Sequence, residues 1–172
     1  MKMVDTIDMK GQLSIQMTDR SGQIIHTSRN HNSIVYTGRD LVARLFLGLT
    51  EEVAPIRYLA VGTGGKSVDP FNDKALQVEV FRKALKPVEI AKDLTDIETS
   101  TDDGKLTNRR IFLSTDLDFM EPKPPENGQP YELREAGLFN AAKGGVMYNR
   151  VVFTNIIKTK DFKLTLVWEI IF

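Results

Sequence analysis

The clearest pattern of apolar and polar residues lies near the end of the chain. Between residues 131 and 172, apolar runs are separated by turn residues at 143–145 and 158–161. In the last run, apolar side chains recur at every second position, namely Leu164, Leu166, Trp168, Ile170 and Phe172. This is the period of a strand with one face against a core. We therefore predict a three-stranded antiparallel meander over 131–172.

The last of these runs is also apolar on its second face. Val167 and Ile171 lie opposite Trp168 and Ile170. Because a strand covered on both sides loses the alternation of apolar and polar residues, we expect this run in the middle of a sheet or beneath a neighbouring subunit. Trp168 is a candidate fold or interface determinant.

Two further elements are predicted in the first third of the chain. Alternating residues over 11–29, with a turn at Asp19–Gly22, indicate a hairpin. A helical stripe follows, with Thr37 as a candidate N-cap, and we expect this stripe to lie across a sheet. The stripe consists of Leu41, Val42, Leu45, Phe46 and Leu49.

A glycine-rich loop follows a short apolar strand over 56–61. Residues 60–67 read AVGTGGKS, a loosened phosphate-loop pattern, so nucleotide binding through Gly62 to Ser67 is one interpretation. A phosphate loop needs a helix to begin at its Gly-Lys-Ser, and Pro70 interrupts any helix here. We favour a turn that needs positive φ or close backbone approach at Gly62, Gly64 and Gly65. A short helix is predicted over 72–79.

The stretch 86–119 predicts a protruding antiparallel hairpin with an Asp-Asp-Gly turn. Its acidic residues admit a calcium loop or catalytic carboxylates as alternatives to a solvated acidic tip. They are Asp93, Asp96, Glu98, Asp102 and Asp103. Because their spacing matches no calcium-binding loop, we favour the solvated tip. The proline-rich stretch 121–131 then predicts an extended connector.

Charged residues enter the first strand of the predicted meander. Arg134 and Glu135 stand among apolar residues in LREAGLFN, residues 133–140. They indicate either an ion pair that fixes the register or an interface, or the solvated face of a strand.

Composition restricts the classes of function. The chain has 172 residues, a formal net charge of zero and no cysteine, so we expect one domain over 1–172 without thiolate sites or attraction to nucleic acid. No run is long enough to span a membrane and no signal peptide is evident. His26 and His31 lack metal-ligand spacing. We predict no metal, no cofactor and no catalytic residue.

The order of these features resembles the N-terminal attachment domain of bacteriophage tail-collar and tail-fibre proteins, and small baseplate proteins of contractile tails. The resemblance covers residues 32–172. It is carried by an Asn-rich lead, TGRDLVARLFLG, PIRYLAVGTGG, LQVEVFRK, LREAGLFN and the apolar terminus. A free-standing copy of such a domain implies an adaptor. The hairpin predicted over 11–29 is not part of the pattern that carries the resemblance.

We therefore expect a mainly β (α+β) fold, an antiparallel sheet or sandwich with one packed amphipathic helix and a protruding hairpin. The resemblance implies a non-enzymatic virion protein made in the host cytoplasm, a connector in the tail, baseplate or neck. Its partners would be other virion proteins and copies of itself, with no nucleic acid and no membrane. A head decoration protein is the alternative, and a nucleotide-binding enzyme is the second alternative.

Overall fold

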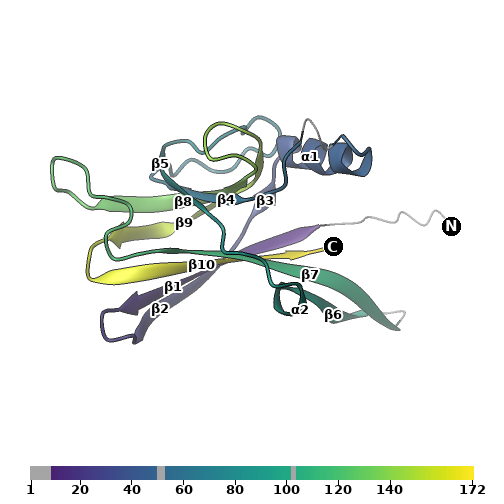
Figure 1. The fold of residues 1–172 in the computed structure, drawn as a ribbon, viewed down its shortest axis with the longest axis horizontal. Coiled ribbons are helices and arrows are strands. Elements are labelled where there is room, and N and C mark those ends of the chain that lie inside the picture. Colours follow the sequence, from purple (N-terminus) through teal and green to yellow (C-terminus); the bar gives the residue numbers. More distant parts are fainter. Residues whose placement is uncertain (1–8, 50–52, 102–103) are drawn as a thin grey trace.

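Two antiparallel sheets packed face to face form the fold, so the predicted mainly β class is confirmed. The structure is a computed structural model that describes residues 9–49, 53–101 and 104–172. Sheet A has the order β2 (Ile24–His31), β1 (Lys10–Asp19), β10 (Phe162–Ile171), β7 (Gly104–Leu117) and β6 (Leu94–Thr101). Sheet B has the order β3 (Ser33–Ile34), β9 (Met147–Lys158), β8 (Tyr131–Phe139), β4 (Tyr58–Gly62) and β5 (Glu79–Ala84) (Figure 1).

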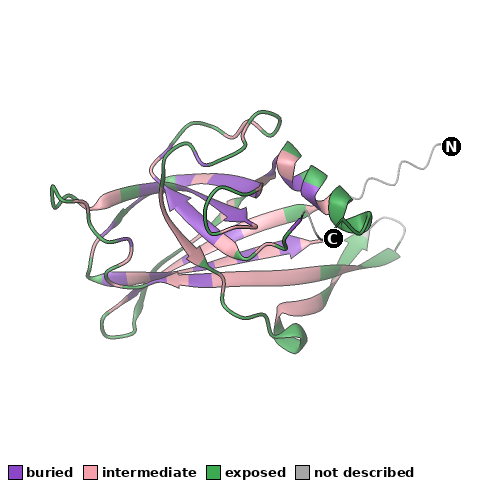
Figure 2. Ribbon diagram, turned by 45° about the horizontal axis from the view of Figure 1, so that its top comes forward, coloured by how far each residue is buried: buried purple, intermediate pink, exposed green. Residues whose placement is uncertain are grey.

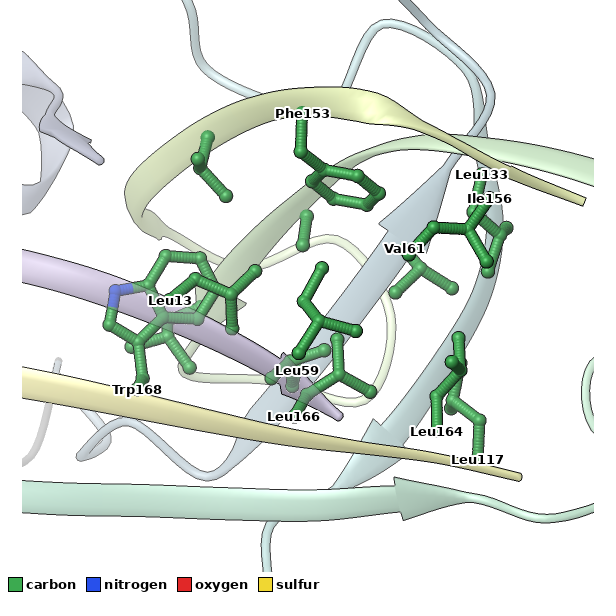
Figure 3. Packing of buried hydrophobic residues seen from close by; sticks show 14 of the residues in the cluster. Leu13, Leu59, Val61, Leu117, Leu133, Phe153, Ile156, Leu164, Leu166 and Trp168 are labelled. Atoms are coloured by element: carbon green, nitrogen blue, oxygen red, sulfur yellow. The ribbon is translucent and has the colours of Figure 1, made fainter. Parts of the chain in front are cut away.

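The core fills the space between the two sheets. Alternate residues of β10 point inward and are buried, and they meet side chains from β4, β8 and β9 of the other sheet. Figure 3 shows Leu166 and Trp168 of β10 facing the same space as Leu59 of β4 and Phe153 of β9. Burial of such side chains is the main favourable contribution to folding, roughly 1.5–3 kcal/mol for each one that is fully buried.

The predicted terminal meander is wrong at its last strand. β8 and β9 pair as expected. After β9 the chain leaves sheet B at residues 159–161, and β10 lies in sheet A between β1 and β7. Trp168 lies opposite Leu13 on one side and Leu113 on the other. The expected central position of the last strand is confirmed. Both neighbours come from distant parts of the chain, which the local pattern does not indicate.

The predicted helix exists as α1 (Tyr36–Phe46), but its stripe does not lie across a sheet. Leu41 is buried and Val42 is half-buried, whereas Leu45, Phe46 and Leu49 are exposed. The helix contacts β9 at the border of sheet B, so only its first half has a surface to pack against. The stripe has helical period, but the part of sheet B that the helix contacts covers only the first half of it.

The N-cap prediction at Thr37 is also wrong. The residue before α1 is Val35, which gives no side-chain cap. The Thr37 hydroxyl instead donates to the carbonyl oxygen of Met147 at 2.7 Å. This bond ties the start of the helix to β9.

The hairpin β1–β2 forms as predicted, and β6 and β7 pair in antiparallel fashion after a single-turn helix, α2 (Ile90–Asp93). Asp102 and Asp103, at the predicted turn, lie outside the described residues. The short helix predicted over 72–79 is wrong, since this stretch consists of turns and bends until β5 begins. Asp73, which lies in this stretch, instead accepts hydrogen bonds from the Asp69 backbone and from Arg150.

Candidate docking site

The candidate site is the loop between β4 and β5, residues 63–78, which a buried carboxylate holds in place. Glu135 of β8 is fully buried. Its Oε1 accepts hydrogen bonds from the backbone N–H groups of Gly64 at 3.1 Å and Val78 at 2.8 Å. Its Oε2 accepts the backbone N–H of Gln77 at 2.9 Å. One side chain therefore fastens both ends of the loop to sheet B.

Arg150 of β9 completes the buried network. Its side chain is 1% exposed, and its Nε donates to Glu135 Oε2 at 2.8 Å. One terminal nitrogen donates to Asp73 Oδ2 at 2.8 Å and the other to the carbonyl oxygen of Lys66 at 3.0 Å. A buried charge is tolerated only when it is paired and hydrogen-bonded, and this guanidinium meets that condition by binding three parts of the site.

The glycines at the start of the loop permit this close packing. A Cβ at Gly62 would lie 2.4 Å from the Val78 carbonyl oxygen, and one at Gly64 would lie 2.5 Å from Glu135 Oε1. Neither glycine has positive φ, so close backbone approach is the reason for both. At Gly65, by contrast, the nearest atom to a Cβ would be Arg134 Cδ at 3.5 Å, an ordinary contact.

The outer part of the loop is ordered by two aspartates. Asp69 accepts hydrogen bonds from the side-chain amide of Asn72 at 2.8 Å and from the backbone N–H of Phe71 at 3.1 Å. These bonds, the Asn72 side chain first, hold the pKa of Asp69 below its ordinary value. Asp73 accepts the backbone N–H of Asp69 at 2.9 Å. The tight turn thus formed presents Phe71, which is 79% exposed.

The loop adjoins the first residue of α1. The backbone N–H of Tyr36 donates to the carbonyl oxygen of Pro70 at 2.7 Å, and the Tyr36 side chain is exposed like its neighbour Phe71. At the other end of the helix, Phe46 and Leu47 are also exposed (Figure 2). We call Phe71 and Tyr36 the loop surface, and Phe46 and Leu47 the helix tip.

The structure brings together three of the six residues that the sequence singled out as fold or interface determinants. Gly62, Gly64 and Glu135 meet in the network, where Glu135 forms a buried ion pair with Arg150. Arg134 is a neighbour of Gly65 but is exposed, and it pairs with Glu132 at 2.6 Å. Its position fits the interpretation as a solvated strand face.

Trp168 is not part of this site. It lies fully buried in β10 of the other sheet, in the core. Its indole N–H has no hydrogen-bond partner among the described residues. Its role is therefore to fill the core, and the interpretation as an interface residue does not hold in the isolated chain.

Arg150 and Asp73 are site residues that were not predicted from the sequence. The signal for Arg150 was present, because it follows Asn149 inside an otherwise apolar run, VMYNRVVF, residues 146–153. A charge in a run of this kind indicates a buried ion pair. No comparable signal marks Asp73, which lies in a polar loop among other charged residues.

The geometry of the loop differs from that of a phosphate-binding loop. The N–H of Gly64 is already bonded to a carboxylate, and the chain continues after Ser67 into turns. A phosphate group would meet the negative charge of Glu135 at the position where a phosphate loop offers free N–H groups. β4 also pairs with antiparallel neighbours only, β5 and β8.

A second charged cluster joins the connector 118–130 to sheet B. Lys83 Nζ pairs with Glu121 Oε2 at 2.5 Å, and these ion pairs, with Asp118 as the second partner, raise its pKa although burial alone would lower it. Lys158 donates to the carbonyl oxygens of Phe119 at 3.2 Å and Thr159 at 2.8 Å. Burial lowers the pKa of Lys158 to about 8.

Metal sites and membrane-spanning helices are two further features that the described residues do not contain. In the described ranges, no group of three or more His, Asp or Glu side chains is placed to hold a metal ion. Among those same residues, no helix is long and apolar enough to cross a membrane. Comparison of the chain with protein-family models, with curated proteins and with solved structures found no match.

Proposed function

We propose that this protein is a structural component of a bacteriophage virion, a connector in the tail, baseplate or neck that docks neighbouring subunits or fibres. The observation that carries the proposal is the loop 63–78, in which a buried ion-pair network supports the exposed side chain of Phe71 next to Tyr36 of α1. In this proposal the protein has no catalytic role and no cofactor, and it is made in the host cytoplasm.

The loop has the properties of a preorganised binding surface. Glu135, Arg150 and Asp73 fix its backbone before any partner is present. A rigid loop loses little conformational entropy on binding, and an exposed aromatic side chain is the kind of residue that contributes most to protein–protein affinity. Phe71 beside Tyr36 therefore supports docking of another protein at this surface.

The site also supports the resemblance stated above. Two of the stretches that carry it are PIRYLAVGTGG and LREAGLFN. They lie about seventy residues apart in the chain, yet the first supplies Gly64 and the second Glu135, which are hydrogen-bonded to one another. The resemblance is thus carried by residues that form one structural unit, the anchored loop.

The test is genetic complementation of a phage that lacks this gene, followed by purification of particles. We expect the wild-type protein in purified particles, with antibody label at the tail, baseplate or neck in electron micrographs. The double variant Tyr36→Ser/Phe71→Ser should fold but be depleted from particles, because the loop surface has lost its apolar side chains. The control Val88→Ser, which changes an exposed apolar residue elsewhere, should be incorporated normally.

Absence of the wild-type protein from purified particles would overturn the proposal. Label over the head would instead identify a head decoration protein. Normal incorporation of the Tyr36→Ser/Phe71→Ser protein would show that the loop surface is not where docking occurs.

A further inference from the structure

The two edges of sheet A are open in the isolated chain. β2 and β6 are the outermost strands of the sheet, and no strand of the described residues pairs with their outer sides. Figure 1 shows them on opposite sides of the sheet. Each is eight residues long. An open edge of this length is a template for pairing with another chain.

Beyond a bulge near its start, where its register with β1 shifts, β2 lacks the usual protection of an edge strand. It has no Lys, Pro, Asp or Glu, and it begins with Ile24 and Ile25, which are 55% and 50% exposed. The edge strand of sheet B is different, since β5 has charged residues along it, including the ion pair between Glu79 and Arg82 at 2.6 Å. Natural proteins protect edges with such charges, so β2 is the edge best suited to receive a strand.

The hydrogen-bond ladder shows which main-chain groups of β2 are free. The N–H of Asn32 donates to the carbonyl oxygen of Gly11, which makes these two residues a hydrogen-bonded pair. Such pairs alternate along an antiparallel ladder, so Asn30 and Ser28 also face β1. Thr27 and Arg29 therefore direct their N–H and C=O groups outward.

The same argument applies to β6. The N–H of Phe172 donates to the carbonyl oxygen of Arg109, so the main chain of Arg109 faces β10. Asp96 lies opposite Arg109 in the β6–β7 ladder, and its own main-chain groups point away from β7. By alternation, Glu98 also points its main-chain groups outward.

The charges of the two edges are opposite in sign. Counted formally, with histidine neutral, β2 carries one positive charge, Arg29, whereas β6 carries two negative charges, Asp96 and Glu98. Among the residues that the structure describes, the ion-pair partners of both carboxylates, Lys105 and Arg109, lie on β7. Two β6 edges brought together would place carboxylates near one another, while β2 beside β6 brings unlike charges together. Charge therefore favours the unlike pair.

We propose that copies of this protein join head to tail, with β2 of one copy pairing with β6 of the next and extending sheet A across the junction. Neighbouring strands of this five-stranded sheet are antiparallel, so β2 and β6 of one copy run in the same direction. When the next copy continues the sheet in the same orientation, its β6 is parallel to β2 at the junction. Main-chain hydrogen bonds hold the strands together and charge selects the edges. The interface is heterologous, which produces a ring if the rotation between copies closes.

This inference deepens the proposed connector role and rests on it, naming a second copy as one partner. It does not use the loop surface or the helix tip. Those surfaces remain available for other virion proteins, so the two kinds of contact can be tested separately.

Cross-linking provides the test, because the chain has no cysteine. Thr27→Cys on β2 and Thr99→Cys on β6 place one thiol on each edge. A bismaleimide that spans roughly 7 Å allows for a shift of about two residues in register, at 3.3 Å per residue. We expect the double variant to give a ladder of cross-linked oligomers, and an equal mixture of the single variants to give dimers. Each single variant alone should remain monomeric in denaturing gels.

His31→Pro tests the main-chain pairing in the double-cysteine protein. By the same alternation it removes an outward N–H without removing a hydrogen bond to β1, and it leaves Arg29 in place, so the cross-linked oligomers should disappear. His31→Val keeps the N–H and should retain the cross-linked oligomers. Thermal unfolding of both variants shows whether the fold is intact.

Dimers from Thr27→Cys alone would overturn the proposal in favour of a symmetric β2–β2 contact. The proposal is also overturned if no variant is cross-linked at high protein concentration or in purified particles. If no variant is cross-linked but the protein is incorporated normally into particles, the pairing of copies is rejected and the connector role is not. Absence from particles would reject the connector role itself.

Discussion

The protein contains cross-strand ion pairs in two very different environments. In sheet B, Glu135 and Arg150 are both buried and support the loop 63–78. In sheet A, Glu98 and Lys105 pair across β6 and β7 at 2.9 Å, with side chains 61% and 74% exposed. The chemical groups are similar and the distances differ by only 0.1 Å, 2.9 Å against 2.8 Å. The difference between the regions therefore lies in access to water.

The distance between two charged groups does not by itself show how much their ion pair contributes to stability. An exposed pair exchanges hydration for a weak attraction in water, and its net effect on stability is about 0–1 kcal/mol. A buried pair has lost its hydration, so removing one partner leaves an uncompensated charge and costs about 3–5 kcal/mol. We expect the buried network to determine the shape of the loop. The exposed pairs should contribute mainly to solubility and to the charge of the β6 edge.

The largest effect is expected from Arg150→Met. The substitution removes the cation between Glu135 and Asp73 and the bond to the Lys66 carbonyl oxygen, so the free energy of unfolding should fall by about 3–5 kcal/mol. Urea unfolding gives this value. Trypsin cleavage at Lys66 and Lys74 in the native protein should also become faster, because the loop loses its support.

A matched control is available in the adjacent strand. Arg134→Met removes an exposed pair with Glu132 and should change stability by less than about 0.5 kcal/mol. Equal effects of the two arginine substitutions would show that burial does not distinguish these pairs.

The next effect is expected from Gly64→Ala. The new Cβ would lie 2.4 Å from the Gln77 Cβ and 2.5 Å from Glu135 Oε1, so the loop must shift away from its anchor at a cost of about 1–3 kcal/mol. Thermal unfolding measures the change. Gly65→Ala is the control, because its Cβ would meet only an ordinary contact at 3.5 Å, and its stability should be unchanged or slightly higher. A neutral Gly64→Ala protein would contradict the close-packed description of the loop.

Lys158 is a buried cation whose hydrogen bonds go to carbonyl oxygens, and its effect on stability depends on pH. Burial lowers its pKa to about 8 in the folded protein, against an ordinary value of 10.5. Between these values the unfolded chain binds more protons, so the stability contributed at this site rises as pH increases from about 8 to 10.5. Below pH 8 the amine is charged in both states, and the cost of burying that charge is fully present.

The measurement is the difference in unfolding free energy between wild type and Lys158→Met as a function of pH. We expect the wild type to gain about 1–2 kcal/mol relative to the variant from about pH 8 to 10, less than the full pKa difference implies because this range stops short of the ordinary pKa of 10.5. Lys160→Met, an exposed neighbour, should show a flat difference. A flat difference for Lys158→Met as well would show that its amine is not desolvated.

The smallest effect is expected from Glu98→Gln in the exposed hairpin. The loss of its pair with Lys105 should lower the unfolding free energy of the monomer by less than about 0.5 kcal/mol, and by still less at high salt. Urea unfolding at two salt concentrations checks this. A loss of several kcal/mol would mean that the hairpin pairs are as important as the buried network.

Much of the candidate site was predictable from local sequence features. The glycines and the charged LREAGLFN run were each identified, because Gly64 and Glu135 stand out from their immediate neighbours. Their contact was not predictable, since it joins residues 71 positions apart. The sequence pattern places Asp73 in a helix that does not form, because a polar loop gives no local sign that a distant arginine binds one of its carboxylates.

The sequence by itself determined the mainly β class, the hairpin β1–β2, the helix α1 and the covered position of the last strand, because each depends on periodicity over a few neighbouring residues. The tertiary structure alone decided that β10 crosses to sheet A, that half of α1 is uncovered and that Glu135 meets Arg150 inside the protein. These features depend on which distant segments supply a surface, and alternation of apolar residues states that a face is buried without stating which segment buries it.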